Sequence, residues 1–273
     1  LYYHNHGDPV KGRCFFERVL SIYPDYADVL VFRASESLSE GDKERALDLY
    51  SRAAQSDPYN LRAVLELGLR RYRSGDYGQA TVFFQRLVNF YPLNSEACYW
   101  LAASCHMQGS YHQAAEYYRR VLEIDSEYKD AYLNLARVLF KSGKIRSALE
   151  AGCKVLELDP DNTEIMNRLA WSKKKKKKLL NPDKALRLAK RVNKLTERKR
   201  PEFLMTLAAA YSSAGKFEKA SGTAREAIGL CRDRSGLAGT LKRHLTLYEK
   251  EIPLFAGGQR RSEIMRNGEG NDL

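Results

Sequence analysis

Residues 61–94 read LRAVLELGLRRYRSGDYGQATVFFQRLVNFYPLN, and this stretch decides the fold. Apolar residues recur at helical spacing from Val64 until Gly75, which ends the first helix because glycine accepts a left-handed backbone. A second helix carries Phe84 on its apolar face and ends before Pro92, because proline cannot continue a helix. The stretch therefore predicts an antiparallel pair of helices joined by a short turn.

The same pattern recurs along the chain with a period of 34 residues. The residues that keep this step are the glycines Gly7, Gly41, Gly75, Gly109 and Gly143, the alanines Ala46, Ala80, Ala114 and Ala148, and the prolines Pro24, Pro58, Pro92 and Pro160. Small residues on the first helix face the alanines of the second and predict a close approach of the two helices. One helix pair cannot bury its apolar face alone, so the period predicts a stack of neighbouring pairs.

This pattern resembles the tetratricopeptide repeat, whose signature is W-x2-L-G-x2-Y, then A-x3-F, then P. The stretch from Leu133 to Gly143, followed by Ala148, fits that signature well. The resemblance implies an all-α, right-handed α-solenoid of helix pairs with a C-terminal capping helix. Two positions depart from the family pattern, since Arg33 replaces the usual leucine and Gly152 replaces the second-helix aromatic residue.

The repeat register predicts a division of the chain into an array, a cap and a tail. We expect the array over residues 1–234, the capping helix over 235–255, and a disordered tail over 256–273, which has no apolar periodicity. The expected units of the array are 1–26 (partial), 27–60, 61–94, 95–128, 129–162, 163–200 and 201–234. Tyr3 and Gly7 match the repeat slots, so we expect Leu1 to lie within a helix and the parent protein to continue before it.

The C-terminal part carries a narrower resemblance. The segments 181–189 (NPDKALRLA) and 201–211 (PEFLMTLAAAY) look like the C-terminal module of bacterial tetratricopeptide proteins. Some members of that family are attached to membrane glycosyltransferases, while others stand alone. The resemblance therefore implies an alternative in which this segment is the accessory region of a larger enzyme. The segment would be cytoplasmic if it stands alone and extracytoplasmic if it is attached to such a transferase, so its location stays open.

Positive charge is concentrated in the C-terminal part of the 273-residue chain, whose formal net charge is +12. Residues 1–162 hold 20 basic and 22 acidic side chains, a net charge of −2, whereas residues 163–273 hold 26 basic and 12 acidic ones, a net charge of +14. Six of these positive charges form the unbroken run Lys173, Lys174, Lys175, Lys176, Lys177 and Lys178, which is a candidate patch for an anionic partner. Few aromatic residues interleave the basic ones, which disfavours nucleic acid. An anionic membrane surface and a solvated loop are the alternatives left open.

The sequence does not support catalysis by this segment. It contains no P-loop, dinucleotide-binding fingerprint, nucleophile elbow or H-E-x-x-H motif, and no Cys or His pair has metal-ligand spacing. We therefore expect no catalytic, cofactor-binding or metal-binding residues. Cys98 and Cys105 lie two helical turns apart, too far for a disulfide, and are expected in the core. No apolar stretch is long enough to span a membrane.

The remaining candidate site is the groove that first helices line in a stack of helix pairs. Aromatic residues, arginine and methionine recur at its positions, and these types are enriched at protein interfaces. The leading hypothesis is a non-catalytic scaffold that binds an extended peptide or a partner helix, so the expected partner is a protein or peptide. The residues expected to contact the partner are Arg62, Tyr72, Arg73, Tyr99, Arg137, Phe140 and Lys141.

Overall fold

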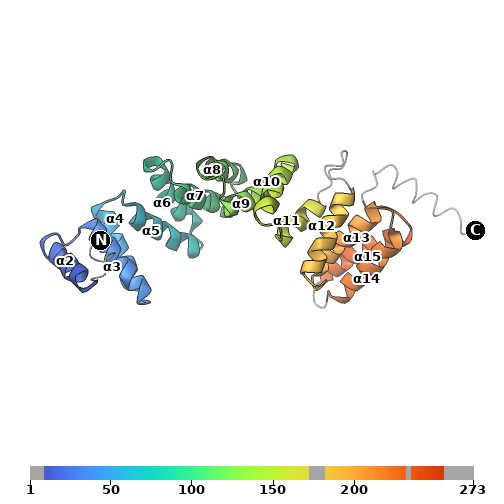
Figure 1. The fold of residues 1–273 in the computed structure, drawn as a ribbon, viewed down its shortest axis with the longest axis horizontal. Helices are drawn as coiled ribbons and strands as arrows, with labels where there is room; N and C mark the ends of the chain where they lie inside the picture. Colours follow the sequence, from blue (N-terminus) through green and yellow to red (C-terminus); the bar gives the residue numbers. More distant parts are fainter. Residues whose placement is uncertain (1–8, 172–181, 232–234, 255–273) are drawn as a thin grey trace, which may run out of the picture. The chain divides into compact units, whose positions relative to one another are not determined.

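The structure is a computed structural model that describes residues 9–171, 182–231 and 235–254. These residues form fourteen α-helices and no strand, so the predicted all-α class is confirmed (Figure 1). The helices are α2 Pro9–Ile22, α3 Ala27–Ser39, α4 Lys43–Ser56, α5 Leu61–Arg73, α6 Tyr77–Phe90, α7 Ser95–Met107, α8 Tyr111–Ile124, α9 Lys129–Lys141, α10 Ile145–Leu158, α11 Thr163–Trp171, α12 Pro182–Leu195, α13 Pro201–Ser213, α14 Phe217–Gly229 and α15 Ser235–Glu249.

Several predictions concern parts of the chain outside the described residues. The lysine run Lys173 to Lys178, the tail over 256–273, and Tyr3 and Gly7 of the partial first unit all lie there. The described chain divides into two compact units, Leu1–Val138 and Leu139–Leu273, and the division falls within α9. We call them unit 1 and unit 2. The predicted division into repeats, cap and tail stays a prediction.

Capping side chains mark the start of several helices. The Asn60 side chain accepts a hydrogen bond from the backbone N–H of Ala63 at 3.1 Å, and the Asn94 side chain accepts one from Ala97 at 2.8 Å. Asp76 caps the second helix of its pair in the same way. These side chains satisfy backbone donors that a helix N-terminus leaves without a partner. At the other end of α5, Gly75 has φ +83°, a conformation that glycine adopts without strain.

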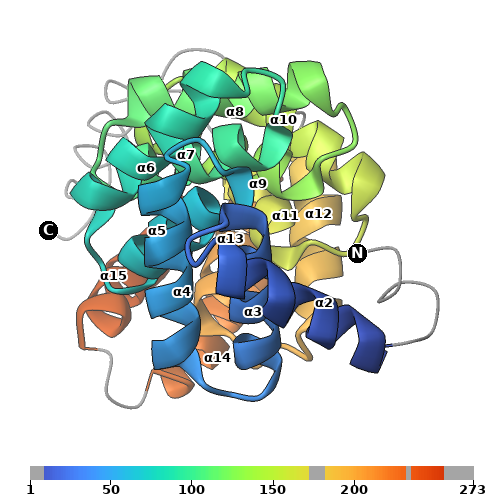
Figure 2. The same cartoon turned by 90° about the vertical axis from the view of Figure 1, so that its left-hand side faces the viewer.

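Within unit 1, large rings of second helices pack against small residues of first helices. In Figure 2, α3 and α4 lie side by side, and their contact buries Ala34 and Tyr50 in one cluster. The next pair shows why the small residue is needed. A Cβ added to Gly68 would lie 2.6 Å from Cε1 of the Phe84 ring, closer than atoms pack in a protein interior. The absence of a side chain at Gly68 therefore makes room for the ring.

Unit 2 ends in a layer formed by the last helices. Ala208 of α13 and Ala224 of α14 pack with Tyr248 of α15, and the tyrosine is 1% exposed. After α15 ends at Glu249, the backbone N–H of Leu254 donates to Oγ of Ser212 at 3.2 Å. The segment after α15 thus folds back onto α13.

Candidate functional site

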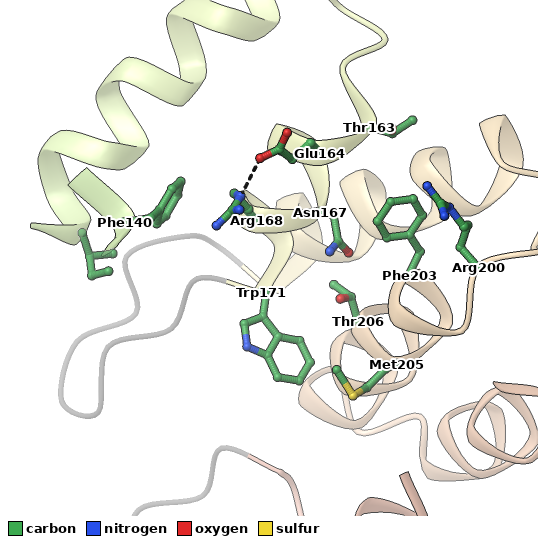
Figure 3. A pocket seen from close by; sticks show the side chains of 11 residues that line it. Phe140, Thr163, Glu164, Asn167, Arg168, Trp171, Arg200, Phe203, Met205 and Thr206 are labelled. Carbon is green, nitrogen blue, oxygen red and sulfur yellow. Dashed lines mark hydrogen bonds and ion pairs between the residues drawn. The ribbon is translucent and has the colours of Figure 1, made fainter. Parts of the chain in front are cut away.

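Unit 2 contains a cleft of about 670 Å3 between the first helices α11 and α13. Figure 3 shows that side chains from both helices face this space. The residues that line it are Phe140, Ile145, Thr163, Glu164, Asn167, Arg168, Trp171, Arg200, Phe203, Met205 and Thr206. Five of them are apolar or aromatic and the others are polar or charged. This mixture is typical of sites that hold a ligand by apolar contact and orient it by hydrogen bonds.

Asn167 is the least satisfied polar group in the cleft. Its side-chain oxygen is buried, and no described residue donates a hydrogen bond to it. A buried acceptor without a donor costs about 1–3 kcal/mol relative to one that is paired. The Asn167 oxygen is therefore set up to accept a hydrogen bond from a group that enters the cleft.

Two guanidinium groups in the cleft rest on aromatic rings. The Arg168 guanidinium lies 5.8 Å from the centre of the Phe140 ring, and its Nε donates to the Glu164 carboxylate at 3.0 Å (Figure 3). The Arg200 guanidinium lies 5.9 Å from the centre of the Phe203 ring. A cation over a ring face is attracted by the ring electrons, so these contacts help to hold both guanidinium groups in place.

In unit 1, the predicted site residues Tyr99 and Arg137 belong to one hydrogen-bonded chain. Nη1 of Arg137 donates to Oδ1 of Asn134 at 3.0 Å, and Nδ2 of Asn134 donates to the Tyr99 hydroxyl at 3.0 Å. The Tyr99 ring also stacks on Tyr128, with the ring centres 5.1 Å apart. Burial, reinforced by nearby Asp130, raises the pKa of Tyr99 to about 12. Tyr99 is thus an anchored part of the packing between helix pairs.

The other predicted residues differ in exposure. Tyr72 is half-buried, its ring 5.3 Å from both Tyr77 and Trp100, and burial raises its pKa. Arg62 is exposed and pairs with Glu66 at 2.8 Å. The exposed Arg73 lines a smaller pocket of about 260 Å3. Unit 1 therefore contains five of the seven predicted residues, and unit 2 contains Phe140 and the exposed Lys141.

Sequence reasoning named part of the unit 2 cleft and missed its other wall. Phe140 is one of the residues expected to bind a partner. The groove positions are the second, fifth, ninth, twelfth and thirteenth of each expected unit, so Asn167 and Trp171 of the unit 163–200 also fall on them. The fifth position of the next unit is Met205. Phe203 and Arg200 lie outside that register, so only the folded chain brings them to the cleft.

Other kinds of site find no support in the parts of the chain that the structure describes. No group of three or more His, Cys, Asp or Glu side chains is arranged to hold a metal ion among these residues. Cys98 and Cys105 are buried, as expected, and the five cysteines form no disulfide. None of the described helices combines the length and the apolar character that crossing a membrane requires.

Comparison with known proteins identifies the class of fold. Residues 106–151 match the family model described as tetratricopeptide repeat. Solved structures with the same arrangement of helix pairs are tetratricopeptide proteins, so the chain has the tetratricopeptide repeat fold. A search of curated proteins finds no significant match to this sequence.

Three solved structures illustrate the likeness. YrrB, described as a tetratricopeptide protein with an unusual peptide-binding site, is 18% identical with a TM-score of 0.61, and the match covers 71% of this chain and 97% of that one. MamA of MSR-1 is 19% identical with a TM-score of 0.53, over 61% and 94% of the two chains. PilF of Pseudomonas aeruginosa is 17% identical with a TM-score of 0.50, over 89% and 92%. At these identities the likeness concerns the fold.

Proposed function

We propose that this protein is a non-catalytic interaction scaffold that binds an extended segment of a partner protein along its first helices. The unit 2 cleft is the principal site of this proposal. The observation that carries it is the buried oxygen of Asn167, which accepts no hydrogen bond from the described residues while aromatic and basic side chains surround it.

An extended peptide matches the chemistry of the cleft. Its backbone offers N–H groups that no internal hydrogen bond uses, and one of them can donate to Asn167. Apolar side chains of the peptide would pack against Trp171 and Phe203, while its carbonyl or carboxylate oxygens would accept hydrogen bonds from Arg200. A partner helix uses most of its backbone N–H groups in its own hydrogen bonds, so only a side chain of such a helix could donate to the Asn167 oxygen.

The predicted residues of unit 1 form a second part of the proposal. Arg62 and Arg73 are exposed and can contact polar groups of a partner, as can Lys141 in unit 2. Tyr72, Tyr99 and Arg137 are tied into the packing of unit 1 and would present a fixed surface. The structural likeness to YrrB, which is described as having a peptide-binding site, supports a peptide as the kind of partner. Attachment to a membrane glycosyltransferase stays a prediction from the C-terminal resemblance.

The test is a selection of binders from a library of random peptides about a dozen residues long, followed by titration of the selected peptides against variants. Asn167→Leu keeps the approximate size of the side chain and removes its acceptor. We expect peptide affinity to fall about tenfold, corresponding to about 1.4 kcal/mol, because the peptide N–H loses its acceptor. The melting temperature should stay equal or rise, because the variant also removes an unsatisfied buried group.

The matched control is Gln113→Leu, which removes an exposed side-chain amide in unit 1 and should leave affinity unchanged. Arg200→Gln should lower the affinity for peptides that carry a carboxylate more than the affinity for neutral peptides. Equal affinity of wild type and Asn167→Leu for every selected peptide, or a library that yields no binder, would refute the proposed site.

A further inference from the structure

Unit 1 exposes an aromatic surface on a second helix, away from the first-helix positions considered above. Tyr59 precedes α5, and Phe90 ends α6; their side chains are 48% and 54% exposed. The two rings stack nearly parallel, with centres 4.4 Å apart and planes at 18°. With Val82, which is 55% exposed, they line a hollow of about 610 Å3. Clustered exposed apolar side chains of this kind mark an interaction surface.

The position of these rings is fixed by the surrounding structure. The Tyr91 hydroxyl donates a hydrogen bond to the backbone oxygen of Tyr59 at 2.9 Å, which ties the loop before α5 to the end of α6. The Tyr91 and Phe90 rings meet edge to face, with their centres 5.0 Å apart. The stacked pair is therefore held in place before any partner arrives, which reduces the entropy cost of binding.

A chain of hydrogen bonds orients the amides beside the rings. The Tyr117 hydroxyl donates to Oε1 of Gln85 at 3.0 Å, and Nε2 of Gln85 donates to Oδ1 of Asn89 at 2.8 Å. Because the Asn89 oxygen accepts from Gln85, the Asn89 amide nitrogen ends the chain as a donor. The hollow thus combines an aromatic face with an N–H donor from Asn89 and a second donor group from Arg86.

The charge of the hollow narrows the kind of partner. Among the described residues that line it, Arg86 is the only charged one, and residues 1–162 carry a net charge of −2. A nucleic-acid backbone is bound through several phosphate contacts, and one arginine on a near-neutral part of the chain cannot supply them. A partner that is neutral, apolar and rich in hydrogen-bond acceptors fits better.

A polypeptide in the polyproline II conformation has these properties. It makes no internal hydrogen bonds, so its carbonyl oxygens need donors from outside, and its proline rings pack on aromatic faces. A helix would offer few unpaired carbonyl groups. We propose that the surface formed by Tyr59, Val82, Arg86, Asn89 and Phe90 binds a proline-rich segment of a partner protein. This second-helix surface is independent of the first-helix site proposed above.

The test is a titration of the full chain with a labelled oligoproline peptide of about ten residues, followed by NMR of the backbone amides and by fluorescence anisotropy. We expect saturable binding with shifts centred on the end of α6 and on Tyr59. Phe90→Ala should weaken binding at least about tenfold, because it removes half of the stacked platform. The ring is half-exposed, so circular dichroism should stay helical.

Asn89→Asp is the sharper variant. It keeps an oxygen for Gln85 but replaces the amide donor by a second acceptor, so oligoproline binding should fall about tenfold. The matched control is Gln79→Glu, which introduces the same charge on the exposed face of α6 outside the hollow and should leave binding unchanged.

Several results would overturn the proposal. These are the absence of saturable oligoproline binding, equal binding of a glycine–serine peptide of the same length, equal affinity of Asn89→Asp and wild type, and shifts that map elsewhere. Binding of a maltooligosaccharide or of poly(U) at this surface without oligoproline binding would assign it to another class of ligand. Asn167→Leu should not affect oligoproline binding, so failure here and failure of the first-helix site can be told apart.

Discussion

Unit 1 and unit 2 fill the same repeat position with side chains of opposite size. The position lies four residues after the second-helix alanine and is buried in every pair. In unit 1 it holds the rings of Tyr50, Phe84 and Tyr118. In unit 2 it holds the small residues Gly152, Ala189 and Ala224. The same helix pair is thus compatible with a large internal side chain or with almost none.

The space left by the small residues of unit 2 is filled from neighbouring helices. A Cβ added to Gly152 would lie 3.2 Å from Leu169 and 3.3 Å from Ile165, which both come from α11. Ala224 packs with Tyr248 of α15. Protein interiors are close-packed, so the volume must be filled, but the side chain that fills it can come from inside or outside the pair. Unit 2 therefore depends more on its neighbouring helices for packing.

The largest expected effect comes from removing one large buried ring in each unit. Phe84→Ala in unit 1 should lower the free energy of unfolding by about 3–5 kcal/mol, because the site is fully buried and cannot collapse onto Gly68. Tyr248→Ala in unit 2 should lower the free energy of unfolding somewhat less. The Tyr248 hydroxyl is buried without a hydrogen-bond partner, so the variant also removes an unfavourable group. Hydrogen exchange of the full chain should lose protection mainly in α5–α8 for the first variant and in α13–α15 for the second.

The half-exposed ring of Phe90 supplies the control, since Phe90→Ala should change stability much less than Phe84→Ala. Each unit also contains one of the chain's two tryptophans, Trp100 and Trp171. Their fluorescence in single-tryptophan variants can therefore follow each unit separately. Equal loss of protection over both units in either variant would contradict the comparison, because it would mean that the rings do not act locally.

A methyl group added at the two glycines should have opposite consequences. Gly68→Ala places a Cβ 2.6 Å from the buried Phe84 ring. This overlap should lower the free energy of unfolding by about 1–3 kcal/mol, which is more than the higher helix propensity of alanine adds. The Cβ of Gly152→Ala meets the side chains of Leu169 and Ile165 at 3.2 Å or more, so a gain in helix propensity of up to about 1 kcal/mol should offset the crowding. Denaturant unfolding followed by tryptophan fluorescence measures both changes.

Phe84→Leu tests the cause of the first effect. In the Gly68→Ala background it should recover part of the lost stability, because it removes the overlapping ring edge. If Gly68→Ala and Gly152→Ala destabilise their units equally, the two glycines would not differ in the way that their surroundings indicate.

Alkaline pH should produce the smallest and most gradual difference. Burial raises the pKa of Tyr99 to about 12 and also raises the pKa of Tyr118 and Tyr128, whereas in unit 2 it raises that of Tyr248. A raised pKa in the folded state means that stability is fully present below pH of about 10 and is lost as the pH rises towards 12. Unit 1 should therefore lose stability more steeply than unit 2 over this range.

Unfolding at a series of alkaline pH values, followed by Trp100 fluorescence, measures how steeply the free energy of unfolding of unit 1 falls with pH. Tyr99→Phe should reduce this slope, because phenylalanine has no proton to lose, while Tyr23→Phe at an exposed tyrosine serves as the control. An unchanged slope in Tyr99→Phe would show that Tyr99 does not ionise differently in the folded and unfolded chain.

Local features of the sequence were sufficient to predict the helices and the turns between them. Gly75 stops a helix through its own backbone conformation, so its effect does not depend on distant residues. Gly152 was recognised as a departure from the family pattern. The consequence of that departure was not predictable, because it depends on which side chains of α11 reach the space.

The candidate sites were less predictable for the same reason. Phe140 was expected at a partner-binding surface, and it lines the cleft, but Arg200 and Phe203 follow no repeat register. Tyr99 was expected to contact a partner, and the structure adds that neighbouring rings and Asn134 hold it in place.

The sequence by itself determined that this protein is a series of helix pairs, where the two helices of residues 61–94 end, and which of their faces are apolar. These properties arise from residues close together in the chain. Only the tertiary structure decided that the oxygen of Asn167 is buried without a donor among the described residues, and that the stacked rings of Tyr59 and Phe90 are exposed to solvent. Hydrogen bonding and exposure of a side chain depend on neighbours from other helices, and the period of the sequence does not specify them.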